Sequence, residues 1–292
     1  MTNKQPELIN LQLQSDISLN NPFAEFKFLL DSRVQKYNSF DFISSDPIQI
    51  PHRFSRKEDI EIAAFLTATI SWGQRKSIIN NANRLMELMD SSPYEFLTET
   101  ALNNGFTSEE SITHPDLKRI SKFVHRTFNG DDCLYFLESL RNIYLNHSGL
   151  EDVFTTGYQL EGSIYGALQH FRKVFLSIPH ETRIRKHISD VAANSSAKRL
   201  NMFLRWMVRS DDCEVDFGLW KNIPSSALML PLDVHTGNVA RGLGLLSRKQ
   251  NDWKAVEEIT AVLRKFDPCD PVKYDFALFG LGVFEGKNPI LH

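Results

Sequence analysis

The chain has 292 residues, of which 42% are hydrophobic and 24% are charged, with a formal net charge of -3 and a pI near 6.3. This composition is typical of a globular chain and excludes the collagen-like, disordered and low-complexity classes. No run approaches the ~20 apolar residues that a membrane span needs, and the first 20 residues lack the apolar centre of a signal peptide, so we expect a cytoplasmic protein.

Apolar residues recur at helical spacing along most of the chain, and no long stretch alternates as a half-buried strand does. Such stripes fall at residues 62–70, 78–89, 137–144, 164–175, 200–207 and 256–263. Breaks between elements are expected at residues 92–93, 129–130, 223–226 and 268–271, where proline, glycine, asparagine and serine gather. The sequence therefore predicts an all-α fold.

A basic region interrupts this mildly acidic chain. Residues 170–209 contain nine lysines and arginines but only two acidic residues. Within it, Lys198, Met202, Arg205 and Arg209 follow helical spacing on a face that is separate from the apolar stripe of the same helix. This pattern is compatible with an ordinary solvated face or with a surface that binds phosphates.

The start of that helix places a lysine in an unusual position. Asn194, Ser195 and Ser196 are good N-cap types, which would put Lys198 in the first turn. The positive end of the helix dipole disfavours a second positive charge there, and so does the neighbouring Arg199. A free amine is a nucleophile, although a surface lysine without a task is the simpler interpretation.

A second segment carries a carboxylate at a helix start. Residues 229–246 read Met-Leu-Pro-Leu-Asp-Val-His-Thr-Gly-Asn-Val-Ala-Arg-Gly-Leu-Gly-Leu-Leu. Here Asp233 follows an apolar run that contains a proline, in the place of an N-cap. The string closely resembles the stretch that carries the catalytic aspartate in the helix-hairpin-helix DNA glycosylases, the superfamily of endonuclease III and the archaeal 8-oxoguanine glycosylase.

The resemblance extends to other parts of the chain with less specific motifs. Residues 65–76 look like the early helix pair of that superfamily, and Lys198 matches the place of its nucleophilic lysine. Residues 103–160 match nothing in the superfamily, and we interpret them as a family-specific insertion or as extra helices. The whole chain also looks like a member of an uncharacterised bacterial family of unknown function.

The resemblance implies one unit over residues 1–292, built as two interleaved helical lobes with a DNA-binding cleft between them. In such an enzyme Lys198 would attack C1′ of a flipped-out nucleotide, and Asp233 would assist as an ionised carboxylate. The Schiff base formed by the lysine would then permit strand cleavage at the abasic site. The implied partner is duplex DNA with a damaged or missing base, and no membrane.

The resemblance also implies residues that contact the DNA. Those expected to bind it are Asn194, Ser195, Ser196, Arg199, Arg205, Arg209, His235, Gln74, Arg75 and Lys76. Those expected to line the pocket for the flipped base are Trp72, Phe276 and Phe279, although aromatic residues at helical spacing are more often core.

Two features depart from the superfamily pattern. Its hairpin normally carries a Gly-x-Gly turn whose amides hold a phosphate, whereas residues 191–196 here read Val-Ala-Ala-Asn-Ser-Ser. Asn194 can adopt the left-handed conformation at little cost, so the turn is weakened rather than excluded. The terminal iron–sulfur loop is absent, and Cys133, Cys213 and Cys269 lie too far apart for a cysteine metal motif, so we expect no metal and no other cofactor.

A second hypothesis fits the same residues. The chain would then be a non-catalytic nucleic-acid-binding protein of the same fold, in which Asp233 only caps a helix. The distance between the Lys198 amine and the Asp233 carboxylate discriminates between the two hypotheses, because catalysis requires both groups to face one cleft.

Overall fold

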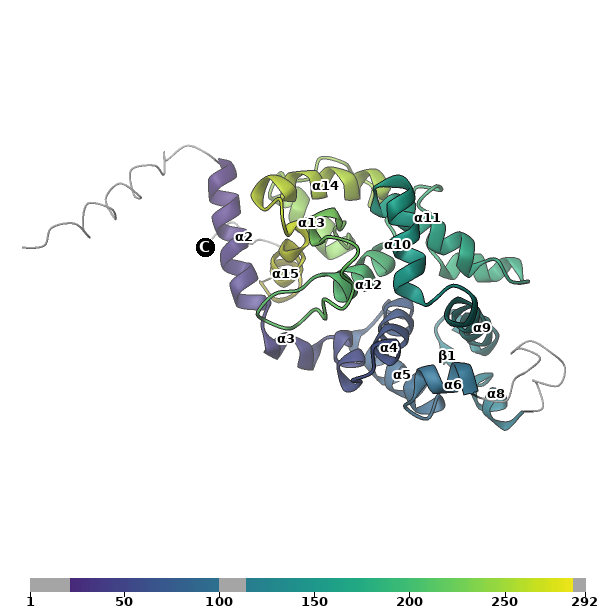
Figure 1. Cartoon of the computed structure of the whole chain (residues 1–292). Helices are drawn as coiled ribbons and strands as arrows, with labels where there is room; N and C mark the ends of the chain where they lie inside the picture. Colours follow the sequence, from purple (N-terminus) through teal and green to yellow (C-terminus); the bar gives the residue numbers. More distant parts are fainter. Residues whose placement is uncertain (1–21, 100–113, 286–292) are drawn as a thin grey trace, which may run out of the picture.

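A computed structural model describes residues 22–99 and 114–285 of the chain. These residues are predominantly helical, and their strands are confined to one two-stranded hairpin. The prediction of an all-α fold is therefore confirmed. Figure 1 shows the arrangement of the helices.

The elements of the first half, in chain order, are α2 (Pro22–Tyr37), α3 (Phe40–Ser45), α4 (Lys57–Thr69), α5 (Arg75–Leu88), α6 (Pro93–Glu99), α8 (Pro115–Ile120), β1 (Val124–His125), β2 (Phe128–Asn129) and α9 (Gly130–Asn146). Those of the second half are α10 (Leu150–Glu161), α11 (Ile164–Phe175), α12 (Lys198–Val208), α13 (Val234–Gly242), α14 (Trp253–Phe266) and α15 (Tyr274–Gly280). Short 3-10 turns lie between several of them, and a π-helical turn, Leu281–Glu285, follows α15.

Each predicted apolar stripe lies on a helix, namely α4, α5, α9, α11, α12 and α14. The break expected at residues 129–130 is the junction between β2 and the start of α9. Asn129 ends β2 and caps α9, where its side chain and that of Asp132 form a reciprocal capping box. The first turn of the helix is therefore held by local hydrogen bonds between Asn129 and Asp132 as well as by tertiary packing.

The two ends of the described chain pack together, because α2 lies against α15 (Figure 1). Gly280 of α15 makes this contact possible, since a Cβ atom there would stand only 2.1 Å from the Tyr37 ring. The Tyr274 hydroxyl donates a hydrogen bond to Asp31 of α2 at 2.9 Å. The N-terminal and C-terminal segments thus share one side of the molecule.

The core is centred on Phe65 of α4, a fully buried side chain. Its ring lies 5.5 Å from that of Phe171, 5.6 Å from that of Phe203 and 6.1 Å from that of Phe136. Of the segment interpreted as an insertion, residues 103–113 lie outside the described residues. The remainder forms α8, the hairpin, α9 and α10, and it contributes Phe136 and Phe154 to the same core.

None of the helices in the described ranges combines the length and the apolar character required to cross a bilayer.

Candidate active site

A cleft of about 910 Å³ lies where the N-termini of α5, α12 and α13 meet the last helix, α15. Its lining includes Lys198 of α12, Asp233 at the start of α13, Arg75 of α5 and Asp275 of α15. Residues far apart in the sequence thus come together around a space large enough for a small organic group.

Lys198 is the first residue of α12, as predicted, but its cap differs from the prediction. The N-cap position is occupied by Ala197, in the left-handed conformation with φ 48° and with no side-chain cap. Ser195 and Ser196, two of the residues predicted as caps, form other hydrogen bonds instead. The Ser195 hydroxyl accepts a hydrogen bond from the Ala197 amide at 3.3 Å, and the Ser196 carbonyl accepts one from the Asn201 side chain at 3.1 Å.

The loop before α12 is fastened to the start of α14. Asn194 has φ 64°, as its residue type allowed. Its side-chain amide donates to Asp252 at 2.9 Å, and its carbonyl accepts from the Trp253 amide at 3.2 Å. The position of Lys198 is therefore set by a loop that another helix N-terminus holds in place.

Asp233 is the N-cap of α13, as predicted. Its Oδ1 atom accepts a hydrogen bond from the Thr236 amide at 3.0 Å, and its backbone carbonyl accepts one from the Asn251 side chain at 2.9 Å. The buried residues Leu230 and Leu232 anchor the chain just before it. Its second carboxylate oxygen, Oδ2, is left to face the cleft.

That second oxygen faces the lysine. The Nζ atom of Lys198 lies 3.9 Å from Oδ2 of Asp233, and each side chain is about a quarter exposed. The same amine lies 3.5 Å from the Met202 sulfur. The structure thus places an amine and a carboxylate side by side and within reach of a molecule in the cleft.

Two further carboxylates, Asp46 and Asp275, line the cleft beside Arg205 and were not among the residues predicted from the sequence. Burial is the main cause that raises the pKa of Asp275, to about 6, although Arg205 opposes the shift. Burial also raises the pKa of Asp46, whose Oδ1 atom accepts a hydrogen bond from the Ile48 amide at 3.0 Å. For Asp275, the sequence does contain a signal of a functional residue, which is a carboxylate among the apolar residues of the last helix.

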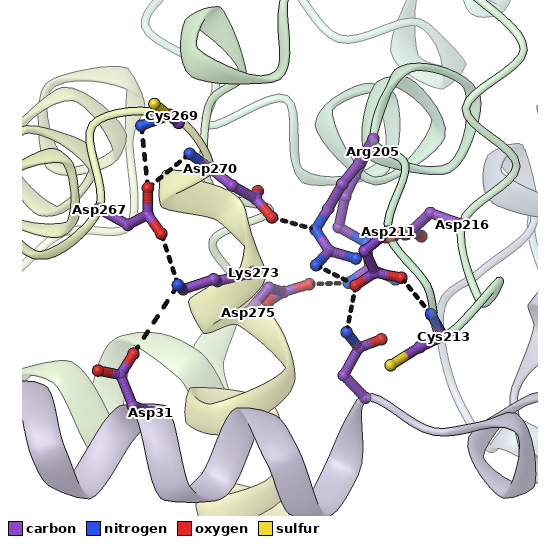
Figure 2. A network of polar contacts seen from close by, with 12 residues as sticks. Asp31, Arg205, Asp211, Cys213, Asp216, Asp267, Cys269, Asp270, Lys273 and Asp275 are labelled. Atoms are coloured by element: carbon purple, nitrogen blue, oxygen red, sulfur yellow. Dashed lines mark hydrogen bonds and ion pairs between the residues drawn. The ribbon is translucent and has the colours of Figure 1, made fainter.

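The structure places Arg205 and Arg209, both predicted to contact DNA, in the interior of the protein, although Arg205 also lines the cleft. Both side chains are at least 95% buried in a network of ion pairs, part of which Figure 2 shows around Arg205 and Asp216. Asp216 accepts from Nε of Arg205 at 3.2 Å and from Nη1 of Arg209 at 3.0 Å, and Arg205 also bonds to Asp275. The face that carries these arginines is covered by the loop after α12 and by α15, so it is not a solvent-facing basic edge.

Arg209 completes this network with two more acidic partners. Its Nε atom lies 2.9 Å from Asp270 and its Nη2 atom 2.6 Å from Asp211. A guanidinium that already donates to three carboxylates inside the protein has no exposed donor for a phosphate.

Arg199 is also bound within the protein. Its guanidinium donates to the His187 carbonyl at 3.2 Å and to the Thr69 carbonyl, and burial lowers its pKa to about 10. The guanidinium carbon lies 5.0 Å from the centre of a Trp72 ring. Arg199 lines the cleft, but these contacts make it a support for Trp72 rather than an open cation.

All three predicted pocket aromatics line the cleft. Trp72 is held from another side by His125, with ring centroids 4.9 Å apart. Phe276 is buried, and its ring centre lies 4.4 Å from the guanidinium carbon of Arg205. The ring centre of Phe279 lies 5.1 Å from the guanidinium carbon of Arg75. These rings give the cleft an apolar, aromatic wall.

The other predicted contact residues lie on the rim. Gln74 and Lys76 are exposed at the start of α5, and Arg75 between them reaches the cleft. His235, the second residue of α13, is exposed and also lines the cleft. Within residues 22–99 and 114–285, no group of three or more His, Cys, Asp or Glu side chains is arranged to hold a metal ion.

Comparison with known proteins yields one family. The model of the family described as "Protein of unknown function (DUF2400)" matches residues 46–284, which include every cleft residue named above. No curated protein and no solved structure matches the chain. Since the match covers most of its length, the chain belongs to the DUF2400 family.

Proposed function

We propose that the protein is a DNA repair glycosylase with abasic-site lyase activity, in which Lys198 is the nucleophile. The observation that carries this proposal is the 3.9 Å approach of the Lys198 amine to the Asp233 carboxylate in one cleft. The two residues lie in segments that resemble the helix-hairpin-helix glycosylases, and they meet although they are 35 positions apart in the sequence. The proposal includes the two-lobed fold and the DNA-binding cleft of that superfamily.

The residues of the cleft suit each step of such a reaction. The free amine of Lys198 attacks C1′, the N-glycosidic bond breaks, and its electron pair leaves with the base, which takes up a proton. The Asp233 carboxylate stabilises the cationic sugar while the glycosidic bond breaks, and it accepts the proton that the amine loses after the bond to C1′ has formed. Opening of the sugar ring gives a Schiff base, and loss of a C2′ proton then expels the 3′-phosphate.

The aromatic wall suits the substrate as well. A base that leaves the duplex stack loses its stacking partners, which costs a few kcal/mol and favours damaged or weakly paired bases. Trp72 and Phe279, which are partly exposed, present apolar ring surface within the same cleft and replace part of that stacking. Such an enzyme works in the compartment that holds the chromosome, which agrees with the cytoplasmic location expected from the sequence.

One observation favours the alternative of a non-catalytic nucleic-acid-binding protein, because Asp233 does cap α13. Capping uses only Oδ1, however, and it accounts neither for the lysine that faces Oδ2 nor for the cleft around both groups. For this reason we place the catalytic proposal first.

Borohydride trapping tests the proposal. The reductant fixes a Schiff base as a stable amine, so the wild-type protein should become covalently linked to an abasic or damaged duplex. Lys198→Gln should bind the same DNA but form no adduct. Base removal that survives in Lys198→Gln but not in Asp233→Asn would instead indicate a glycosylase that activates water, and a wild type without adduct on a broad set of lesions would favour the binding protein.

A further inference from the structure

The amine of Lys198 is held by a thioether. Met202 lies one turn further along α12, and its Sδ atom accepts a hydrogen bond from Nζ of Lys198 at 3.5 Å. Residues four positions apart lie on the same face of a helix, so α12 alone brings the two side chains together. The Asp233 carboxylate, 3.9 Å from the same amine, lies beyond hydrogen-bond distance. The helix that carries the lysine thus also supplies the group that holds its amine.

Met202 is nearly buried and still borders the cleft. Its exposed fraction is 9%, so neighbouring side chains confine an otherwise flexible residue. It shares with Lys198 and Arg205 the face of α12 that lines the cleft. The reaction proposed above gives tasks to the lysine and to the aromatic wall, but it gives none to this sulfur.

The cleft also contains stronger partners for a lysine than a thioether. Burial raises the pKa of Asp46 and of Asp275, and the charge of Lys198 is among the influences that oppose each shift, so the amine lies within electrostatic reach of both carboxylates. A lysine has a flexible stem and three rotatable donors, which would let it turn towards the oxygen that binds it best. A close ion pair of that kind favours the charged amine, which is not a nucleophile.

We propose that Met202 is a positioning residue, whose sulfur holds the Lys198 amine beside Asp233 and keeps it out of a closer ion pair. A thioether is a polarisable but weak acceptor, so it fixes the direction of the amine and leaves the electron pair of the nitrogen available for attack. Met202 acts through Lys198 and not on the substrate itself. The proposal rests on the proposed function, in which this amine is the nucleophile.

Reaction of the free protein with a small aldehyde tests this role without DNA. Formaldehyde and cyanoborohydride methylate a free amine through a Schiff base, and mass spectrometry of the digested protein gives the rate at Lys198. Met202→Leu keeps a similar volume but removes the sulfur, so this rate should fall by about fivefold, the effect of one lost hydrogen bond. Met202→Gln should lower it at least as much, because an amide oxygen is a stronger acceptor and favours the charged amine.

Met229→Leu is the control for the loss of a methionine. Met229 is 8% exposed and its sulfur lies 3.5 Å from Nη2 of Arg264, so it resembles Met202 in burial and in its contact with a cation, but it does not line the cleft. Its substitution should leave the rate at Lys198 unchanged. A rate within about twofold of that of the wild type in either Met202 variant overturns the proposal, and so does an equal fall in Met229→Leu.

Comparison of rate and affinity tests the same role with DNA. Single-turnover borohydride trapping on an abasic duplex should slow by about fivefold in Met202→Leu, while the affinity for a duplex that carries tetrahydrofuran in place of the abasic sugar should change by less than about twofold. Tetrahydrofuran has no aldehyde and forms no Schiff base, so this affinity reports binding alone. A loss of affinity as large as the loss of rate contradicts a positioning role.

Failure of this proposal is distinguishable from failure of the proposed function. If the protein is not a lyase, the wild type forms no adduct with DNA, yet the aldehyde rates of the wild type and the Met202 variants still differ. If Met202 has no positioning role, the wild type and Met202→Leu form the DNA adduct at the same rate.

Discussion

The Nζ atom of Lys198 and the Oδ2 atom of Asp233 lie 3.9 Å apart, and each residue stands at the N-terminus of a different helix. The positive ends of two helix dipoles therefore point towards one region of the cleft. Such a region favours negative charge, which suits the phosphates on either side of a flipped nucleotide.

Asp233→Asn separates the capping role of this residue from its role in the cleft. The asparagine side chain still accepts the hydrogen bond from the Thr236 amide, so the free energy of unfolding should fall by less than about 1 kcal/mol. Loss of the charge beside Lys198 should slow base removal by about 10² to 10⁴. Denaturant unfolding and single-turnover excision measure the two effects.

The matched control is Asp59→Asn, because this carboxylate also accepts a hydrogen bond from a backbone amide, that of Tyr94 at 2.8 Å, and does not line the cleft. Its rate of base removal should stay within a few-fold of that of the wild type. Asp233→Asn protein that is unfolded, or that retains the full rate, contradicts the role proposed for the carboxylate.

The buried arginines should matter for stability rather than for DNA contact. Arg209→Ala leaves Asp211 and Asp270 without their guanidinium partner and Asp216 with Arg205 alone, and the loss of one member of a buried ion pair costs about 3 to 5 kcal/mol. Lys27→Ala removes a partly exposed pair with Asp31 and should cost at most about 1 kcal/mol. Urea unfolding of both variants decides the matter, and a cost below 1 kcal/mol for Arg209→Ala would mean that the network contributes little.

Asp275 gives the stability of the protein a pH dependence. Its pKa of about 6 in the folded protein lies above the ordinary value of 3.8, mainly because it is buried. Between these two values the folded protein holds a proton that the unfolded chain has lost, so the contribution of Asp275 to the free energy of unfolding falls as the pH rises from 4 to 6.

Asp275→Asn removes this titration while it keeps an oxygen that accepts from Arg205. Relative to the variant, the wild type should lose about 3 kcal/mol of stability across that window, with no further relative change above pH 7. Unfolding curves at a series of pH values show the difference. Parallel curves for the two proteins from pH 4 to pH 6 would contradict a raised pKa for Asp275.

Local patterns in the sequence were sufficient to predict the elements that carry the site. The stripe of α12 and the cap at Asp233 depend on neighbours within a few residues, so periodicity and residue type predicted them correctly. The exact cap of α12 was not predictable in this way, because Ala197 holds a left-handed conformation imposed by the loop that Asn194 fastens to α14.

Long-range partners account for what sequence analysis missed. Arg205 and Arg209 looked like a basic edge because their partners Asp216, Asp270 and Asp275 come from a loop and from the end of the chain. The β1–β2 hairpin has two residues in each strand, too few to leave an alternating pattern. Its place beside Trp72 depends on the hydrogen bonds of His125, which no local pattern indicates.

The most direct test of the central claim is to identify the residue that becomes linked to DNA. Wild-type protein is incubated with an abasic duplex in the presence of borohydride, digested with a protease, and the peptide that carries the reduced sugar is sequenced by mass spectrometry. We expect a single modified residue, Lys198, and no modified peptide from Lys198→Gln. An adduct on another lysine, such as Lys76 on the rim, or no adduct on any lesion would contradict the central claim.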